Sequence, residues 1–261
     1  NMDGTKDWGD GTSDTNTTHT YTAYGDYTIK CNGTTMTTSS NSGLFGQTSS
    51  INYYCTEARF ATVTSIGDYA LRICHSLTSV VIPNGVTSIN NGAFYSCYSL
   101  TSVVIPNSVT SIGSKSFNGC VSLTSIIIPG SVTSVGNNAF NGCNSLTSII
   151  IHGSVTSIGD FAFNGCGSLT SVVLPDGVTS IGRSAFYNCY SLKSVIIPIG
   201  VTSIGIDTFH NCFSLTSVIL PDGVTSIGDY AFYGCGALKS AILPNGIKRI
   251  ANSAFQSCYS L

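Results

Sequence analysis

A repeat of 23 residues governs this chain of 261 residues from about residue 58 onward. A column of cysteines keeps that step, at Cys74, Cys97, Cys120, Cys143, Cys166, Cys189, Cys212, Cys235 and Cys258. All seven prolines share a second column, from which only the fourth full unit departs, with His152. Eight full units run from Leu77 to Ser260, and a partial unit precedes them. A unit this short cannot bury its own apolar side chains, so the repeat predicts a solenoid of stacked rungs.

The unit 77–99, LTSVVIPNGVTSINNGAFYSCYS, shows how one rung is built. Leu77, Val80 and Ile82 predict a short strand whose inner side chains face a core. The Pro-Asn-Gly run at 83–85 is typical of a turn, and residues 86–89 predict a second extended segment. The AFxxC run at 93–97 has the spacing of one inward-facing helical or 3₁₀ turn. The expected fold is an α/β-type repeat solenoid, mostly β, with short helical or 3₁₀ turns and about eight to nine rungs.

The composition excludes several classes of partner. Charged residues make up 8 % of the chain and the formal net charge is −2, with no basic run. These values argue against nucleic acid as a partner and against electrostatic docking to anionic lipid. Serine and threonine supply the polarity instead, with 39 and 30 residues. No apolar run approaches the length of about 20 residues that a transmembrane helix needs, so we expect no membrane insertion.

The unit pattern LxxVxIPxxVTSIGxxAFxxCxS resembles the BspA-type leucine-rich repeat, which has units of the same length. The resemblance covers residues 58–261 and implies a right-handed leucine-rich-repeat solenoid. It also implies a secreted, extracellular or cell-surface protein that acts in adhesion and is not an enzyme. The family brings neither a catalytic motif nor one particular ligand, so the partner that it implies is a protein or a glycan.

Residues 1–57 lack the repeat and are rich in Asp, Thr, Asn and Tyr. The run WGDGT from Trp8, followed by HTY from His19 and GDYTI from Gly25, resembles the last strands of a PKD-type β-sandwich. The resemblance covers only the C-terminal half of such a domain. We therefore expect three parts: a partial PKD-like β segment at 1–31, a linker and N-terminal cap region at 32–57, and the solenoid at 58–261.

The cysteine column predicts buried free thiols. Stacked rungs place neighbouring Cα atoms about 5 Å apart, inside the range of a disulfide, but parallel side chains do not suit its dihedral angle of about 90°. An inward cysteine beside phenylalanine also behaves as a small hydrophobe. Cys31 and Cys55 lie off the column, and the sequence leaves open whether they form a disulfide.

No constellation of residues supports catalysis, a metal site or a cofactor. Asp10, Thr12, Asp14 and Asn16 alternate as oxygen donors, but they lack the central glycine and the closing glutamate of a calcium loop. The four histidines are scattered over the chain, and no serine lies in a G-x-S-x-G elbow. We expect neither a catalytic residue nor a metal ligand.

One strand position predicts an outward row of aliphatic side chains. If the residues on either side point inward, this position must point outward, on the concave sheet. The row consists of Val81, Val104, Ile127, Ile150, Val173, Ile196, Ile219 and Ile242. It would run for about 40 Å. Two interpretations are open: an interaction surface, or β-branched residues that merely suit a strand.

A second candidate site is an aromatic patch where the later units differ from the middle ones. It consists of Tyr187, Tyr190, His210, Phe213, Tyr230 and Tyr233. Tyr95 and Tyr98 form a smaller patch in the first full unit. Rings about 5 Å apart could hold a glycan or a protein loop, since tyrosine offers contact area together with a hydroxyl. Drift on an exposed edge is the alternative interpretation.

Together these features predict an extracellular, non-enzymatic binding or adhesion scaffold that presents a repetitive surface to a host protein, a cell surface or a glycan. The alternative is a structural spacer or a self-assembling unit of a surface filament. The chain stops at Leu261, the first residue of another unit, without a polar cap. Such an end would invite self-association by head-to-tail stacking.

Overall fold

The computed structural model describes residues 63–261 in full, and of residues 1–62 it describes the backbone of six strands. These strands are β1 (Lys6–Asp7), β2 (Ser13–Asp14), β3 (Thr18–Thr22), β4 (Tyr27–Cys31), β5 (Thr34–Ser39) and β6 (Cys55–Phe60). Most of the predicted PKD-like segment and linker lies outside the described residues, as do Asp10, Thr12 and Asn16.

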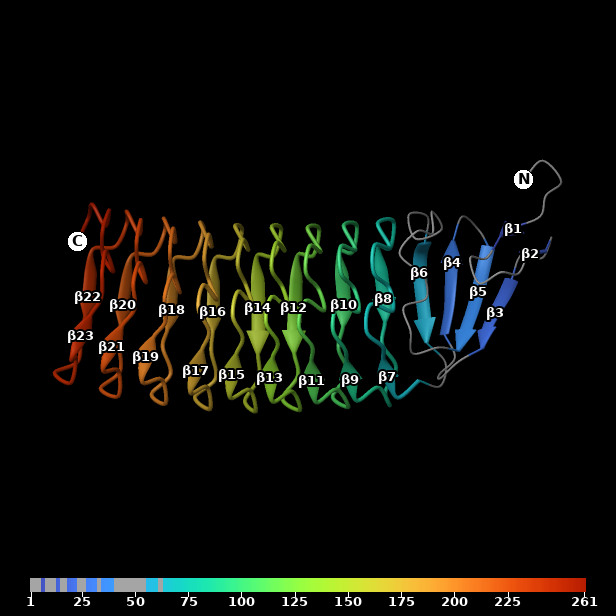
Figure 1. The fold of residues 1–261 in the computed structure, drawn as a ribbon, viewed down its shortest axis with the longest axis horizontal. Coiled ribbons are helices and arrows are strands. Elements are labelled where there is room, and N and C mark those ends of the chain that lie inside the picture. The colour runs from blue at the N-terminus through green and yellow to red at the C-terminus, as the bar shows by residue number, and fades with distance from the viewer. Residues whose placement is uncertain are drawn as a thin grey trace.

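From residue 63 onward each rung contributes two strands, and the rungs stack along one axis (Figure 1). The longer strands are β8 (Ser79–Val81), β10 (Ser102–Val104), β12 (Ser125–Ile128), β14 (Ser148–Ile151), β16 (Ser171–Val173), β18 (Ser194–Ile196), β20 (Ser217–Ile219) and β22 (Ser240–Ile242). The shorter strands are β7 (Ser65–Ile66), β9 (Ser88–Ile89), β11 (Ser111–Ile112), β13 (Ser134–Val135), β15 (Ser157–Ile158), β17 (Ser180–Ile181), β19 (Ser203–Ile204), β21 (Ser226–Ile227) and β23 (Arg249–Ile250).

Neighbouring rungs pair in parallel and in register. In the longer strands Ile127 of β12 lies opposite Ile150 of β14, and in the shorter ones Ile112 of β11 lies opposite Val135 of β13. The parallel pairing extends back to β6, which pairs with β8 on one side and antiparallel with β4 on the other. The predicted solenoid with a repeat of about 23 residues is confirmed, and its rungs pair through parallel strands.

The expected helical or 3₁₀ turn is instead a run of hydrogen-bonded turns, and residues 63–261 contain no helix. Its N–H groups alternate in direction: Tyr95 donates within the rung to the carbonyl of Gly92, 2.9 Å away, whereas Phe94 donates to Ser116 of the next rung, 2.7 Å away. Positive φ angles of 60° at Gly92 and 57° at Ser96 cause this alternation, because each left-handed residue redirects the chain before a helix can propagate. The turn therefore forms hydrogen bonds between rungs with backbone groups that a helix would use for bonds within itself.

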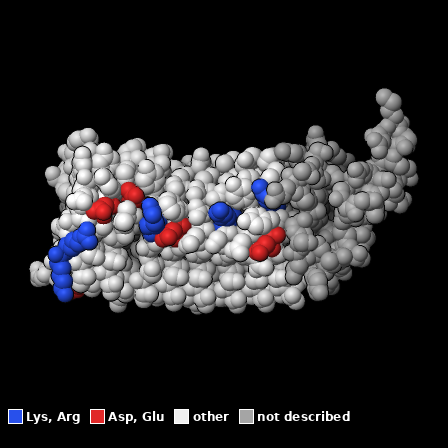
Figure 2. Space-filling model, viewed as in Figure 1, with Lys and Arg blue, Asp and Glu red and all other residues white. Residues whose placement is uncertain are grey.

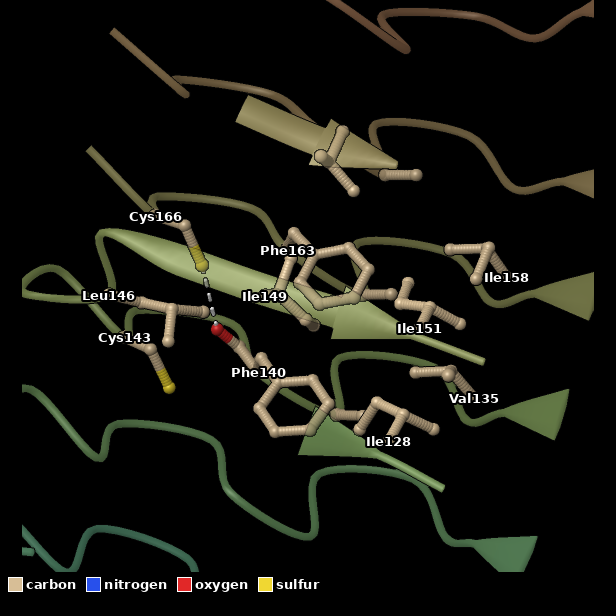
Figure 3. Close-up of a cluster of buried hydrophobic side chains, with 14 of the residues drawn as sticks. Ile128, Val135, Phe140, Cys143, Leu146, Ile149, Ile151, Ile158, Phe163 and Cys166 are labelled. Atoms are coloured by element: carbon tan, nitrogen blue, oxygen red, sulfur yellow. Dashed lines mark hydrogen bonds between the residues drawn. The ribbon is translucent and has the colours of Figure 1, made fainter. Parts of the chain in front are cut away.

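A stack of phenylalanine rings forms the centre of the core. Its members, one per rung, are Phe94, Phe117, Phe140, Phe163, Phe186, Phe209, Phe232 and Phe255. Successive ring centroids lie 5.0–5.5 Å apart with interplanar angles of 2–14°. Figure 3 shows two of these rings beside inward leucine and isoleucine side chains from the strands. Every rung thus supplies the same shape to the next, which is what lets identical units share one core.

The nine cysteines of the column are free thiols, as predicted, and all but Cys258 are buried. From Cys97 onward each thiol donates to a backbone carbonyl of the preceding rung; Cys166 Sγ, for example, lies 3.3 Å from the oxygen of Phe140 (Figure 3). That carbonyl also accepts the backbone N–H of Cys143, at 3.2 Å. The thiol column therefore uses the second lone pair of a buried carbonyl and joins rungs without any disulfide.

A glycine follows the second strand in most rungs, and its missing side chain allows the close approach of the preceding rung. An ideal Cβ on Gly159 would lie 2.6 Å from the nitrogen of Asn137 and 2.7 Å from the carbonyl carbon of Gly136. At Gly205 the nearest atom is the hydroxyl oxygen of Thr208, at 3.2 Å, and backbone atoms lie farther away. Of these two glycines, only Gly159 faces backbone that cannot rotate aside.

We predict that Gly159→Ala lowers the free energy of unfolding by about 1–3 kcal/mol, because the added methyl group must push two rungs apart. The matched variant Gly205→Ala should change it by less than about 1 kcal/mol. Urea unfolding followed by circular dichroism measures both. Equal losses in the two variants would contradict a specific role for the rung contact at Gly159.

Candidate functional site

Eight aliphatic side chains form one exposed row on the longer strands, called here the aliphatic stripe. It consists of Val81, Val104, Ile127, Ile150, Val173, Ile196, Ile219 and Ile242, each 50–71 % exposed. Their strand neighbours point the other way; Val80 and Ile82, for instance, are 3 % and 4 % exposed. In-register pairing brings the members side by side in three groups: Val81 with Val104, the four members from Ile127 to Ile196, and Ile219 with Ile242. The stripe is therefore apolar surface built on three successive groups of hydrogen-bonded strands.

Hydroxyl groups border the stripe where the strands begin. The first residue of every longer strand from β8 to β22 is an exposed serine. The threonine before it donates to the carbonyl of the preceding rung, as in Thr147 Oγ1 to Thr124, 3.1 Å away. In two rungs Lys193 and Lys239 replace that threonine. Figure 2 shows few charged side chains on the face that it draws, so most of the described surface there consists of uncharged residues.

Four of the six predicted aromatic-patch residues lie together, with three tyrosines around His210, and we call these four the His210 cluster. The His210 ring lies 4.6 Å from Tyr187 of the rung before and 4.7 Å from Tyr233 of the rung after, measured between centroids. Tyr230 completes the group, 5.9 Å from Tyr233. His210 Nδ1 lies 2.8 Å from Asp207 Oδ1, which orients the imidazole within the stack. The cluster is thus a rigid set of rings rather than independent surface residues.

The remaining two residues form a separate stack, the Tyr190–Phe213 pair. Their ring centroids are 5.2 Å apart with an interplanar angle of 12°. Tyr190 is 42 % exposed and Phe213 is 50 % exposed. Each ring covers one face of the other, so the exposed surface of the pair includes ring edge and the tyrosine hydroxyl.

A third group of rings occupies the first described rungs and includes residues that the sequence analysis missed. His75 stacks on Tyr98 with centroids 4.3 Å apart, and the guanidinium of Arg72 lies 5.6 Å from the Tyr95 ring and 5.7 Å from the Tyr69 ring. Partial burial lowers the pKa of His75 below its ordinary value. The repeat period could have indicated this group, since Arg72 and His75 precede Tyr95 and Tyr98 by one repeat length and therefore stack against them.

The described part of the chain offers no metal centre: within it no three His, Cys, Asp or Glu side chains gather closely enough to hold an ion. Among the same residues no helix could cross a membrane. The stripe and the ring groups present aliphatic side chains, aromatic rings and hydroxyl groups as contact surface.

In the antiparallel pairing of β4 with β6, Cys31 lies opposite Cys55, next to a register shift between Lys30 and Cys31. Directly opposed residues in regular antiparallel strands have Cα atoms about 4.5–5.5 Å apart, within the range that a disulfide spans. The disulfide between them stays a prediction, because their side chains lie outside the described part of the chain.

The fold and its surface define a repeat scaffold, a solenoid of parallel strands. Residues 38–261 match the family described as BspA type leucine rich repeat region, in overlapping stretches 38–163, 64–193 and 179–261. The chain therefore belongs to the BspA-type leucine-rich repeat family. The match does not reach residues 1–37, so the resemblance of that segment to a PKD-type domain stays a prediction.

Two solved structures illustrate the similarity. A leucine rich repeat protein of T. pallidum is 35 % identical over 64 % of this chain and 80 % of its own, with a TM-score of 0.59. A leucine rich cell surface protein of Faecalibacterium prausnitzii is 32 % identical over 76 % of this chain and 68 % of its own, with a TM-score of 0.48. No curated protein matches the chain.

Proposed function

We propose that this chain is a non-enzymatic scaffold at a cell surface and that its aliphatic stripe binds a protein partner. The exposed stripe carries the proposal, since eight β-branched side chains that are at least half exposed lie at the same position of successive rungs. Membership of the BspA-type family supports the surface location, because the resemblance to that family implies a secreted or cell-surface protein.

The stripe is also preorganised for binding. Its side chains branch at Cβ and stand on strands that each pair with at least one neighbouring strand, so they hold few rotamers and lose little entropy when a partner covers them. A long row of equivalent contacts suits an extended partner, because many weak contacts act together.

A protein partner fits this surface better than a glycan does. Aromatic recognition of a sugar uses open ring faces, but one face of each ring in the Tyr190–Phe213 pair and both faces of His210, between Tyr187 and Tyr233, lie against another ring. These groups also present ring edges and tyrosine hydroxyls, the combination that tyrosine supplies at protein interfaces. The aromatic groups then act as secondary anchors beside the stripe.

The double variant Ile127→Lys/Ile150→Lys tests the proposal, because it places two charges at the middle of the stripe while both positions stay half exposed. The probe is a printed array of purified matrix and serum proteins together with oligosaccharides. We expect the parent chain to bind at least one protein on the array, and the variant to bind it at least about tenfold more weakly, a loss of about 1.4 kcal/mol.

The control variant Thr133→Lys/Thr156→Lys adds the same charge to the same two rungs, at exposed positions on the shorter-strand side. It should bind like the parent chain, and circular dichroism should show that both variants keep the fold. Binding that survives in the stripe variant, or binding to oligosaccharides alone, would contradict the proposal.

A further inference from the structure

The described residues contain six Asn-Gly pairs, and the structure divides them into two environments. Four pairs lie in the turn that follows the shorter strand: Asn91–Gly92, Asn118–Gly119, Asn141–Gly142 and Asn164–Gly165. The other two, Asn84–Gly85 and Asn245–Gly246, lie in the exposed turn between the longer and the shorter strand. Asn-Gly is the sequence in which an asparagine amide is lost most readily, because glycine leaves the following peptide nitrogen sterically open.

The four turn pairs are held by bonds between rungs. The N–H of Gly119 donates to the carbonyl of Asn141, 2.7 Å away, and the N–H of Gly142 donates to that of Asn164, also 2.7 Å away. The carbonyl of Asn118 in turn accepts the N–H of Ser96, at 2.7 Å. A peptide fixed on both sides cannot rotate its nitrogen toward the neighbouring side chain unless two rungs separate.

Asn245–Gly246 has no such restraint. Both residues are exposed, and the N–H of Gly246 donates to no group of the described residues. The turn is closed by a different bond, from the N–H of Ile247 to the carbonyl of Pro244, at 3.2 Å. In the equivalent pair Asn84–Gly85, the N–H of Gly85 donates to the hydroxyl of Ser108, at 3.2 Å, so that pair is partly restrained.

We propose that Asn245 is a site of spontaneous deamidation in the folded protein. The peptide nitrogen of Gly246 attacks Cγ of Asn245 and forms a five-membered succinimide. The side-chain NH₂ group of Asn245 takes up the proton that the Gly246 nitrogen loses and leaves as ammonia. Water then opens the ring at either carbonyl, to aspartate or to isoaspartate. The net change is the addition of water and the loss of ammonia, and it needs no enzyme, oxidant or ligand.

The aspartate product fits the fold, because the chain already has aspartate at the same turn position in two other rungs, Asp176 and Asp222. Both are exposed. Deamidation therefore adds a third carboxylate to this row of turns in a chain whose formal net charge is −2. The modification is independent of the proposed binding function.

Trypsin separates the two environments cleanly, since the lysines and arginines that bound the peptides of interest are Lys115, Arg183, Lys239 and Lys248. Peptide 240–248 contains Asn245 as its single asparagine, and peptide 116–183 contains three of the restrained pairs. The folded protein is incubated near pH 8.5, then digested briefly, and the mass gain of about 1 Da is followed in both peptides. We expect peptide 240–248 to deamidate at least about tenfold faster than peptide 116–183.

Two controls separate fold from sequence. In urea the rung bonds are lost, so peptide 116–183, with three pairs, should become the faster of the two. Gly246→Ala should slow the reaction of peptide 240–248 in the folded protein, and an ideal Cβ there meets nothing closer than the carbonyl of Asp222, at 3.5 Å. Equal rates in the folded protein, or an unchanged rate in Gly246→Ala, would overturn the proposal.

Discussion

Phe163→Ala is expected to lower the free energy of unfolding by about 3–5 kcal/mol. The Phe163 ring is fully buried and stacks on Phe140 and Phe186, with centroids 5.5 Å and 5.3 Å away. Alanine would leave a cavity against both neighbours, and the surrounding rungs cannot close it because their backbones are bonded to each other. Since each rung contacts only its neighbours, the defect weakens two interfaces at once.

The matched variant is Phe163→Leu, because Leu71 already occupies this column one rung before Phe94 and is fully buried. Leucine keeps most of the volume, so the loss should stay below about 1.5 kcal/mol. Urea unfolding monitored by circular dichroism compares the two. A small loss for the alanine variant, equal to that of the leucine variant, would show that the column tolerates cavities and would contradict its central role.

Alkaline pH is expected to destabilise the fold steeply, because burial raises the pKa of the six thiols of the cysteine column from Cys97 to Cys212. The pKa of Cys143 is raised to about 12 from an ordinary value of 9.0, and burial raises the pKa of Cys120 and Cys166 in the same direction. In the unfolded chain these thiols lose their protons near pH 9. Their contribution to stability is therefore complete below about pH 9 and is lost as pH rises toward about 12, at about 1.4 kcal/mol per pH unit for each thiol.

Urea unfolding at several pH values between about 8 and 11, with a reductant present, measures this slope. Cys143→Ala removes one thiol and should flatten the slope by about 1.4 kcal/mol per pH unit, although it lowers stability at about pH 8. Tyrosine and lysine titrate alike in both proteins, so the difference between the two slopes isolates the thiol. Parallel slopes would contradict a buried, protonated Cys143.

The repeat made most of the fold predictable. The 23-residue period, with apolar residues at fixed positions, required stacked rungs and identified the inward side chains of the strands, because burial on one face of a strand follows from its two-residue alternation. The turn after the shorter strand was not predictable in the same way. Its first left-handed position carries residues as different as Lys115, Asn138 and Phe161, although its second carries glycine in four rungs, at Gly119, Gly142, Gly165 and Gly234.

The candidate site also has one part that the sequence made predictable and one part that it did not. The outward position of the stripe follows from strand alternation, whereas the grouping of the rings depends on which turn residues project together. Tyr187 and Tyr190 are close in sequence, but each stacks along its own column, on His210 and on Phe213. Arg72 and His75 were not predicted, because the partial unit that holds them lacks the proline and the phenylalanine that mark a full unit.

The in-register bonds between rungs have a consequence for how such a chain can change its length. Most bonds between rungs recur at the same positions of successive units, so a tandem duplication or deletion of one whole unit restores most of them across the junction. The spacing between the ring groups around Tyr95 and His210 then changes only in steps of one strand separation, about 4.8 Å. Recombination that adds or removes whole units can therefore change the distance between these two ring groups in fixed steps, while the residues of each group stay the same.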